Sequence, residues 1–115
     1  MSTFHLLDLT RAQEFAFETE QLRELVASFE QSLGQEIANI QAGLAANEAL
    51  KVEHALHALK GFMPLFVDEN LAQAVTDLYQ TSRAQPLAVT GPLFNSLVPK
   101  LSALRVEVGT WLRPL

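Results

Sequence analysis

The sequence predicts an all-α fold, an antiparallel four-helix bundle with a short extra helix at the N-terminus. Apolar residues recur at steps of three and four along almost the whole of the 115-residue chain. The apolar–polar alternation typical of strands is nearly absent. Short connections join the four long helical segments, and such segments pack most simply as an antiparallel bundle.

The first long helix is expected over residues 19–47, after a short leading helix over residues 8–17 that covers one end of the bundle. Thr19 is its predicted N-cap, with a glutamate next to it in the positively charged first turn. A helix of about 28 residues is roughly 42 Å long. Gly34 and Gly43 weaken it and are the expected points of a bend. Its apolar stripe consists of Leu22, Leu25, Val26, Phe29, Leu33, Ile37, Ile40 and Leu44.

The second long helix is expected over residues 48–66, and Asp68 is the predicted N-cap of the third. The third helix should end at residues 83–86, because a residue that precedes a proline avoids the helical region. The inward residues of the second helix are Val52, Leu56, Leu59, Met63 and Phe66, and those of the third are Leu71, Val75, Leu78 and Tyr79.

The last helix is expected to open at Thr90, because proline is tolerated in a first turn and Pro92 follows closely. Pro99 lies further along and is expected to kink or split this helix. The predicted inward residues are Phe94, Leu97, Leu101, Leu104, Val108 and Leu112.

The length and composition predict a single cytoplasmic domain over residues 1–115. An acidic domain with a single apolar stripe per helix is expected to be a monomer. A net charge of −5 and a pI near 5.0 argue against a nucleic-acid surface. The absence of cysteine excludes disulfides, thiol catalysis and thiolate metal sites. We find no signal peptide and no uninterrupted apolar stretch of about 18 residues, so no membrane span is expected.

The stretch EHALHALKG, residues 53–61, places histidines on the outer face of the second helix. Since successive helical residues are about 100° apart, His57 lies about 140° from the apolar stripe. Gly61 and His54 lie within about 20° of the direction opposite the core. Glu53 and Lys60 flank this face, while Leu50 and Pro64 stand seven residues before and after His57.

Several interpretations of these histidines are open. An exposed histidine is most often a solvated surface residue. His54 and His57, with Glu53, could hold a metal ion, but metal sites usually take ligands from more than one element, and the only other histidine is His5. Serine–histidine hydrolysis lacks a nucleophile elbow. An exposed glycine within a helix favours a third interpretation, a surface that a partner approaches closely.

The segment His57-Ala58-Leu59-Lys60-Gly61 resembles the H-x-L-K-G signature of histidine-containing phosphotransfer (HPt) domains. These four-helix modules carry phosphoryl groups between response-regulator receiver domains in two-component phosphorelays. The resemblance extends over nearly the whole chain: LRELVASF, residues 22–29, resembles the start of the family's apolar helix, and GLAANEA, residues 43–49, resembles the turn before its histidine helix.

The resemblance implies a phosphocarrier rather than an autonomous enzyme. It makes His57 the phosphoacceptor, Lys60 the cation that offsets the phosphoryl charge, and Gly61 the space for the phosphoryl group. Leu50, Glu53, His54 and Pro64 become partner-binding residues. The implied partners are receiver domains and a hybrid sensor histidine kinase, and the receiver supplies Mg²⁺, so the chain needs no cofactor or metal of its own. Neutral imidazole, the main form of histidine at pH 7, is nucleophilic without a dedicated base.

Beyond Gly61 the chain departs from the family pattern. Phe62 stands where a small residue is usual, Pro64 should end the histidine helix, and Val67 and Asp68 replace glycine and alanine. These differences define the alternative function: an adaptor with the same fold that binds receiver or kinase domains without accepting phosphate.

Overall fold

The protein is all-α, as the sequence predicts. The computed structural model describes residues 4–114, so the predictions for residues 1–3 and 115 lie outside the described part. Its helices are α1 (Thr10–Gln13), α2 (Thr19–Ala45), α3 (Ala49–Phe62), α4 (Glu69–Ala84) and α5 (Leu87–Leu112), with a 3₁₀ turn, η1 (Met63–Leu65), after α3. No helix within residues 4–114 is long and apolar enough to cross a membrane.

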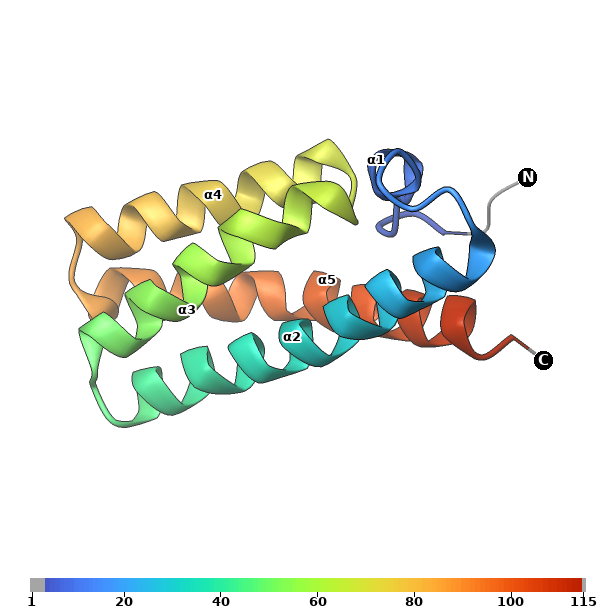
Figure 1. The fold of residues 1–115 in the computed structure, drawn as a ribbon. Coiled ribbons are helices and arrows are strands. Elements are labelled where there is room, and N and C mark those ends of the chain that lie inside the picture. The colour runs from blue at the N-terminus through green and yellow to red at the C-terminus, as the bar shows by residue number, and fades with distance from the viewer. Residues whose placement is uncertain (1–3, 115) are drawn as a thin grey trace.

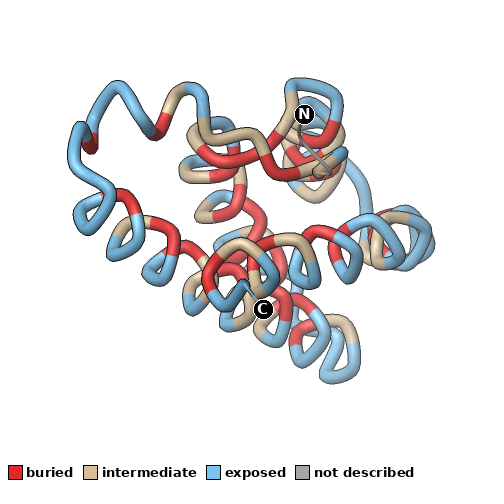
Figure 2. The backbone as a smooth tube through the Cα atoms, turned by 90° about the vertical axis from the view of Figure 1, so that its right-hand side faces the viewer, coloured by how far each residue is buried: buried red, intermediate tan, exposed pale blue. Residues whose placement is uncertain are grey.

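The four long helices form an antiparallel bundle in which each packs against the next, and α5 returns to α2 (Figure 1). The bundle measures 43 × 25 × 21 Å, and its long axis matches the length of α2, about 40 Å at 1.5 Å per residue. Buried residues line the inner sides of the helices (Figure 2). Among the predicted inward residues, Leu25, Leu44, Tyr79 and Leu97 are only partly buried.

The bounds of α1, α2 and α3 differ from the predictions. The leading helix is limited to Thr10–Gln13 instead of residues 8–17. The N-cap of α2 is Glu18 rather than Thr19, because Glu18 forms a capping box with Gln21, whose Oε1 accepts the Glu18 backbone N–H at 3.5 Å. Helix α3 ends at Phe62 rather than Phe66, since Pro64 cannot continue the hydrogen-bond ladder.

Helix α5 begins three residues earlier than predicted and is not divided. Pro86 is its N-cap, and its carbonyl accepts the backbone N–H of Val89 at 2.9 Å, so the buried Thr90 lies inside the first turns. Of the two predicted effects of Pro99, a kink or a split, the split does not occur. Both Pro92 and Pro99 are exposed, and water can therefore satisfy the carbonyls that lack an N–H partner.

Neither Gly34 nor Gly43 interrupts α2. Gly43 is buried at the contact with α3, where a Cβ atom would lie 2.7 Å from Cγ2 of Val52. This glycine is therefore a close-packing position between two helices. The N-cap of α4 is Asp68, as predicted, and its Oδ1 accepts the Leu71 N–H at 3.0 Å.

An N-terminal segment holds the turn that follows α3. The backbone N–H groups of Asp8 and Asp68 donate to the carbonyls of Phe66 and Leu6, at 2.8 and 2.9 Å. The Arg11 guanidinium donates to the carbonyls of Pro64 and Val67. These bonds satisfy backbone groups that the break after α3 leaves outside any helix.

Candidate functional site

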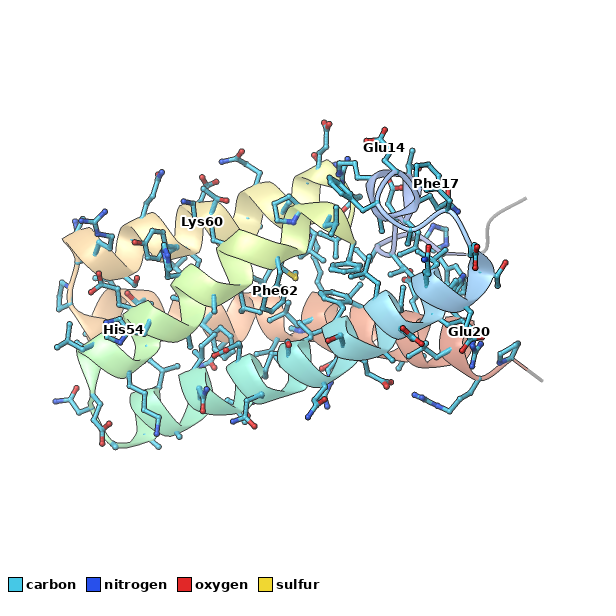
Figure 3. The ribbon with its side chains drawn as sticks, viewed as in Figure 1. Glu14, Phe17, Glu20, His54, Lys60 and Phe62 are labelled. Carbon is cyan, nitrogen blue, oxygen red and sulfur yellow. The ribbon has the colours of Figure 1, made fainter. Side chains whose placement is uncertain are left out.

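The outer face of α3 presents the residues of the predicted site. His57 and Gly61 are exposed, and Lys60 is half-buried on the side toward α4 (Figure 3). Apart from its two chain neighbours and the local helix backbone, no described atom lies within 4 Å of the point that a Gly61 Cβ would occupy. The fold itself therefore gives no steric reason for glycine at this position.

Tyr79 on α4 lies beside the imidazole of His57. The two ring centroids are 5.2 Å apart with an interplanar angle of 54°, within the range of favourable ring contacts. The Nζ atom of Lys60 lies 5.4 Å from the Tyr79 ring centroid, a cation–π distance. One aromatic ring thus contacts both the predicted phosphoacceptor and the predicted cation.

A second cation, Arg83, approaches the same ring. Its Cζ atom lies 5.9 Å from the Tyr79 centroid, and its Nε atom is 3.6 Å from Oε1 of Glu53. Glu53, His57 and Lys60 occur at steps of four and three, and so line the edge of α3 that faces α4. The site therefore spans two helices and contains one imidazole, two cations and one carboxylate.

The other predicted partner-binding residues are spread along α3 and η1. Leu50 is 67% exposed in its first turn, and Pro64 is exposed in η1. At about 1.5 Å per residue, the stretch from Leu50 to the end of α3 at Phe62 spans about 18 Å, and Pro64 lies beyond that end. His54 is exposed on the side toward α2, where it lines a shallow pocket with Glu36 and Asn39. The structure therefore does not bring His54 to the Tyr79 ring.

Phe62, the bulky residue after Gly61, is directed toward α2 (Figure 3). Its ring makes an edge contact with Phe29 at 5.7 Å, and Phe29 stacks on Phe66 at 4.2 Å. Phe62 therefore anchors the end of α3 to the core and leaves the imidazole of His57 uncovered.

The metal-binding interpretation finds no support in the described part of the chain. Within residues 4–114, no three histidine, aspartate or glutamate side chains gather closely enough to hold a metal ion. Glu53, the third ligand of that interpretation, pairs with Arg83 instead.

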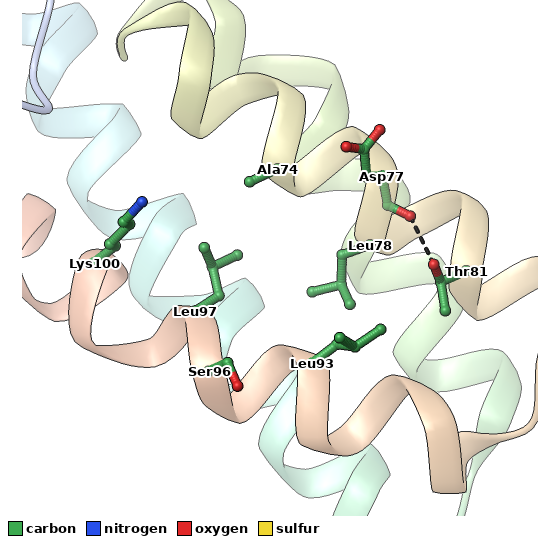
Figure 4. A pocket seen from close by; sticks show the side chains of 8 residues that line it. All are labelled: Ala74, Asp77, Leu78, Thr81, Leu93, Ser96, Leu97 and Lys100. Carbon is green, nitrogen blue, oxygen red and sulfur yellow. Dashed lines mark hydrogen bonds between the residues drawn. The ribbon is translucent and has the colours of Figure 1, made fainter.

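A shallow groove of about 310 Å³ lies between α4 and α5, on the side of α4 away from α3 (Figure 4). Leucine side chains form much of its lining, and the Thr81 hydroxyl donates to the Asp77 carbonyl at 3.0 Å beside it. Its lining residues are Ala74, Asp77, Leu78, Thr81, Leu93, Ser96, Leu97 and Lys100. None of them belongs to the His57 site.

The sequence did not point to Tyr79 or Arg83 as site residues. The apolar periodicity predicted Tyr79 as an inward residue, and Arg83 stood in the predicted end of its helix. The i, i+4 spacing of these two residues was the only available signal, because it places both on one face of α4.

No protein-family model, curated protein sequence or solved structure matches this chain significantly. The HPt-like motif and the geometry around His57 are the features of the chain that bear on its function.

Proposed function

We propose that this chain is a histidine phosphotransfer protein that accepts a phosphoryl group from a receiver aspartate on His57 and passes it to another receiver. The open space at Gly61, one turn from an exposed histidine, carries the proposal. An alanine there would favour the helix by about 1 kcal/mol and would meet no neighbouring atom, so an approaching partner explains the glycine.

The chain supplies the nucleophile for this transfer. A lone pair on a ring nitrogen of neutral His57 attacks the phosphorus of the receiver's aspartyl phosphate. A P–N bond forms as the P–O bond to the aspartate breaks, and its electron pair stays on the carboxylate. The other ring nitrogen can release its hydrogen to water. The exposure of His57 permits the approach of a folded receiver domain.

In this proposal, Lys60 and the receiver both offset the negative charge of the phosphoryl group. The Lys60 ammonium, three residues after His57, offsets the negative charge that arrives with the phosphoryl group. The receiver brings the acidic pocket and its Mg²⁺, which activate the phosphoryl group. The chain acts as a carrier in signal transduction, and a hybrid sensor histidine kinase is the proposed source of the phosphoryl group.

Leu50 and Pro64 form the proposed docking contacts on either side of His57. Both are exposed apolar residues on a surface that also carries charge, a combination found at protein interfaces. The packing of Phe62 on Phe29 supports this arrangement, because it accounts for a bulky residue after Gly61 without obstructing the histidine.

The test is incubation with phosphorylated receiver domains and Mg²⁺. We expect an acid-labile, base-stable label on the wild-type chain and no label on His57→Gln. Absence of label with every receiver of the producing cell would contradict the proposal. Receiver binding that His57→Gln leaves unchanged, without any transfer, would instead establish the adaptor function.

A further inference from the structure

The ion pair between Glu53 and Arg83 lies at the edge of the site, where a phosphoryl group on His57 would introduce two negative charges. We propose that Glu53 is an internal competitor for that group: it holds Arg83 until the phosphoryl group arrives and displaces it. This inference rests on the proposed function, because it requires a phosphoryl group on His57.

The Arg83 guanidinium and the His57 imidazole both contact the Tyr79 ring. Their distances from its centroid are 5.9 and 5.2 Å. A phosphoryl group extends outward from the imidazole, and the arginine side chain is long and 63% exposed, so it is free to turn toward the new charge. Guanidinium groups bind phosphoryl oxygens in a two-pronged geometry that ammonium groups lack.

The present partner of Arg83 is weakly held. The N–O separation of 3.6 Å exceeds the usual length of a charge-assisted hydrogen bond, and ion pairs at exposed positions contribute little to stability. Glu53 offers one negative charge, whereas the phosphoryl group offers up to two. Exchange of Glu53 for the phosphoryl group as the partner of Arg83 is therefore favourable. The pull of Glu53 on Arg83 reduces the free energy that this exchange releases.

The alternative explanation for Glu53 is a local surface contact that tethers α3 to α4. In that case, loss of the carboxylate lowers the stability of the bundle slightly and leaves the chemistry of His57 unchanged. Simple repulsion between Glu53 and the phosphoryl group is a third possibility. Repulsion would be weaker with Arg83 present, because Arg83 partly neutralises Glu53. Under repulsion, the effect of Glu53→Gln on the rate would therefore be larger without Arg83.

Phosphoramidate separates these explanations without a receiver, because this small donor phosphorylates imidazoles directly. The P–N bond of phosphoramidate breaks as the new P–N bond to the imidazole forms, and ammonia leaves with the electron pair. The measured quantity is the rate of phosphorylation at His57, resolved by mass spectrometry and divided by the rate at His5 in the same molecule. Glu24→Gln on α2 is the matched control, since it removes the same charge from an exposed position outside the site.

We expect Glu53→Gln to raise the relative rate at His57 about two- to fivefold, the range that an exposed ion pair supports. Glu24→Gln should leave it unchanged, and Arg83→Gln should lower it. Competition further predicts that Glu53→Gln raises the relative rate at His57 more in the wild-type chain than in the Arg83→Gln background, where there is no arginine to release.

Two results would overturn the proposal that Glu53 competes with the phosphoryl group for Arg83. One is a Glu53→Gln rate equal to that of wild type or of Glu24→Gln. The other is a gain that is equal or larger in the Arg83→Gln background, which is the signature of simple repulsion. If the predicted pattern appears with phosphoramidate but no receiver labels the chain, the proposed function fails while the competition stands. If receivers label His57 and the Glu53→Gln gain is absent, only the competition fails.

Discussion

Gly61 lies on the exposed side of α3, one turn after His57, where the helix itself would favour alanine. We expect Gly61→Ala to raise the free energy of unfolding by about 0.5–1 kcal/mol, because it removes backbone freedom from the unfolded chain. The same methyl group should slow transfer from a phosphorylated receiver by about tenfold, or ~1.4 kcal/mol in the barrier. Urea unfolding and single-turnover transfer measure the two effects.

Gly34→Ala on α2 is the control for this prediction. Its new Cβ would meet only the end of the Arg105 side chain, at 3.1 Å, and the position lies outside the His57 site. It should leave the transfer rate unchanged. If Gly61→Ala also leaves the rate unchanged, the glycine does not serve the approach of a partner.

Tyr79 contacts the His57 imidazole through its ring rather than its hydroxyl in this structure. We therefore expect Tyr79→Phe to preserve the position of the imidazole, and Tyr79→Leu to release it. The ring-current shift of the His57 ring protons, measured by NMR, should be lost in Tyr79→Leu and kept in Tyr79→Phe.

Labelling of His57 should slow about two- to fivefold in Tyr79→Leu, the effect expected from one ring contact. A shift that is the same in Tyr79→Leu as in wild type would show that the two rings do not meet in solution.

At the scale of the helices, the contact between α2 and α3 is controlled by Gly43. A methyl group there would lie 2.7 Å from Cγ2 of Val52 and 3.3 Å from the Glu48 carbonyl oxygen, so the two helices would have to move apart. We expect Gly43→Ala to lower the free energy of unfolding by about 1–3 kcal/mol, as overpacking does in other cores.

Denaturant unfolding of a double-mutant cycle tests whether the clash is with Val52. Val52→Ala should cost less stability in the Gly43→Ala background than in wild type, because it removes the obstructing methyl group. Strictly additive losses would place the clash on the backbone rather than on the Val52 side chain.

Helical periodicity predicted the four long elements well, but it predicted their ends less well. The start of α5 illustrates the reason: Pro86 and Pro92 each satisfy the rule for a helix beginning, and the sequence offered no basis for choosing between them. The structure begins the helix after Pro86. A lost hydrogen bond at Pro92 is tolerated there, because this residue faces solvent.

In the candidate site, the sequence predicted what depends on one helix but not what depends on the packing of two helices. The outward direction of His57 followed from the geometry of α3 alone and is confirmed. Tyr79 and Arg83 could not be placed, because their approach depends on the register between α3 and α4. The turn at residues 63–68 connects the two helices and is hydrogen-bonded to the N-terminal segment, and neither contributes to helical periodicity.

At the scale of the whole molecule, the His57 site lies on an exposed outer face of α3. Core residues on the inner side of α3, including Leu56 and Leu59, fix the helix, while His57 projects outward between them in sequence. A reactive group on such a face suits chemistry with another folded domain, because the partner can supply the remaining catalytic groups. The proposed phosphocarrier thus supplies the histidine, and its partner supplies the other catalytic groups.

The most direct test of that claim is site-mapped detection of phosphohistidine after incubation with each phosphorylated receiver of the producing cell. Mass spectrometry under mildly basic conditions, where phosphohistidine survives, identifies the modified side chain. We predict a phosphoryl group on His57, with none on His54 or His5, and its disappearance when a second unphosphorylated receiver is added. Phosphate on His54 instead, or an unmodified His57 with every receiver, would contradict the account.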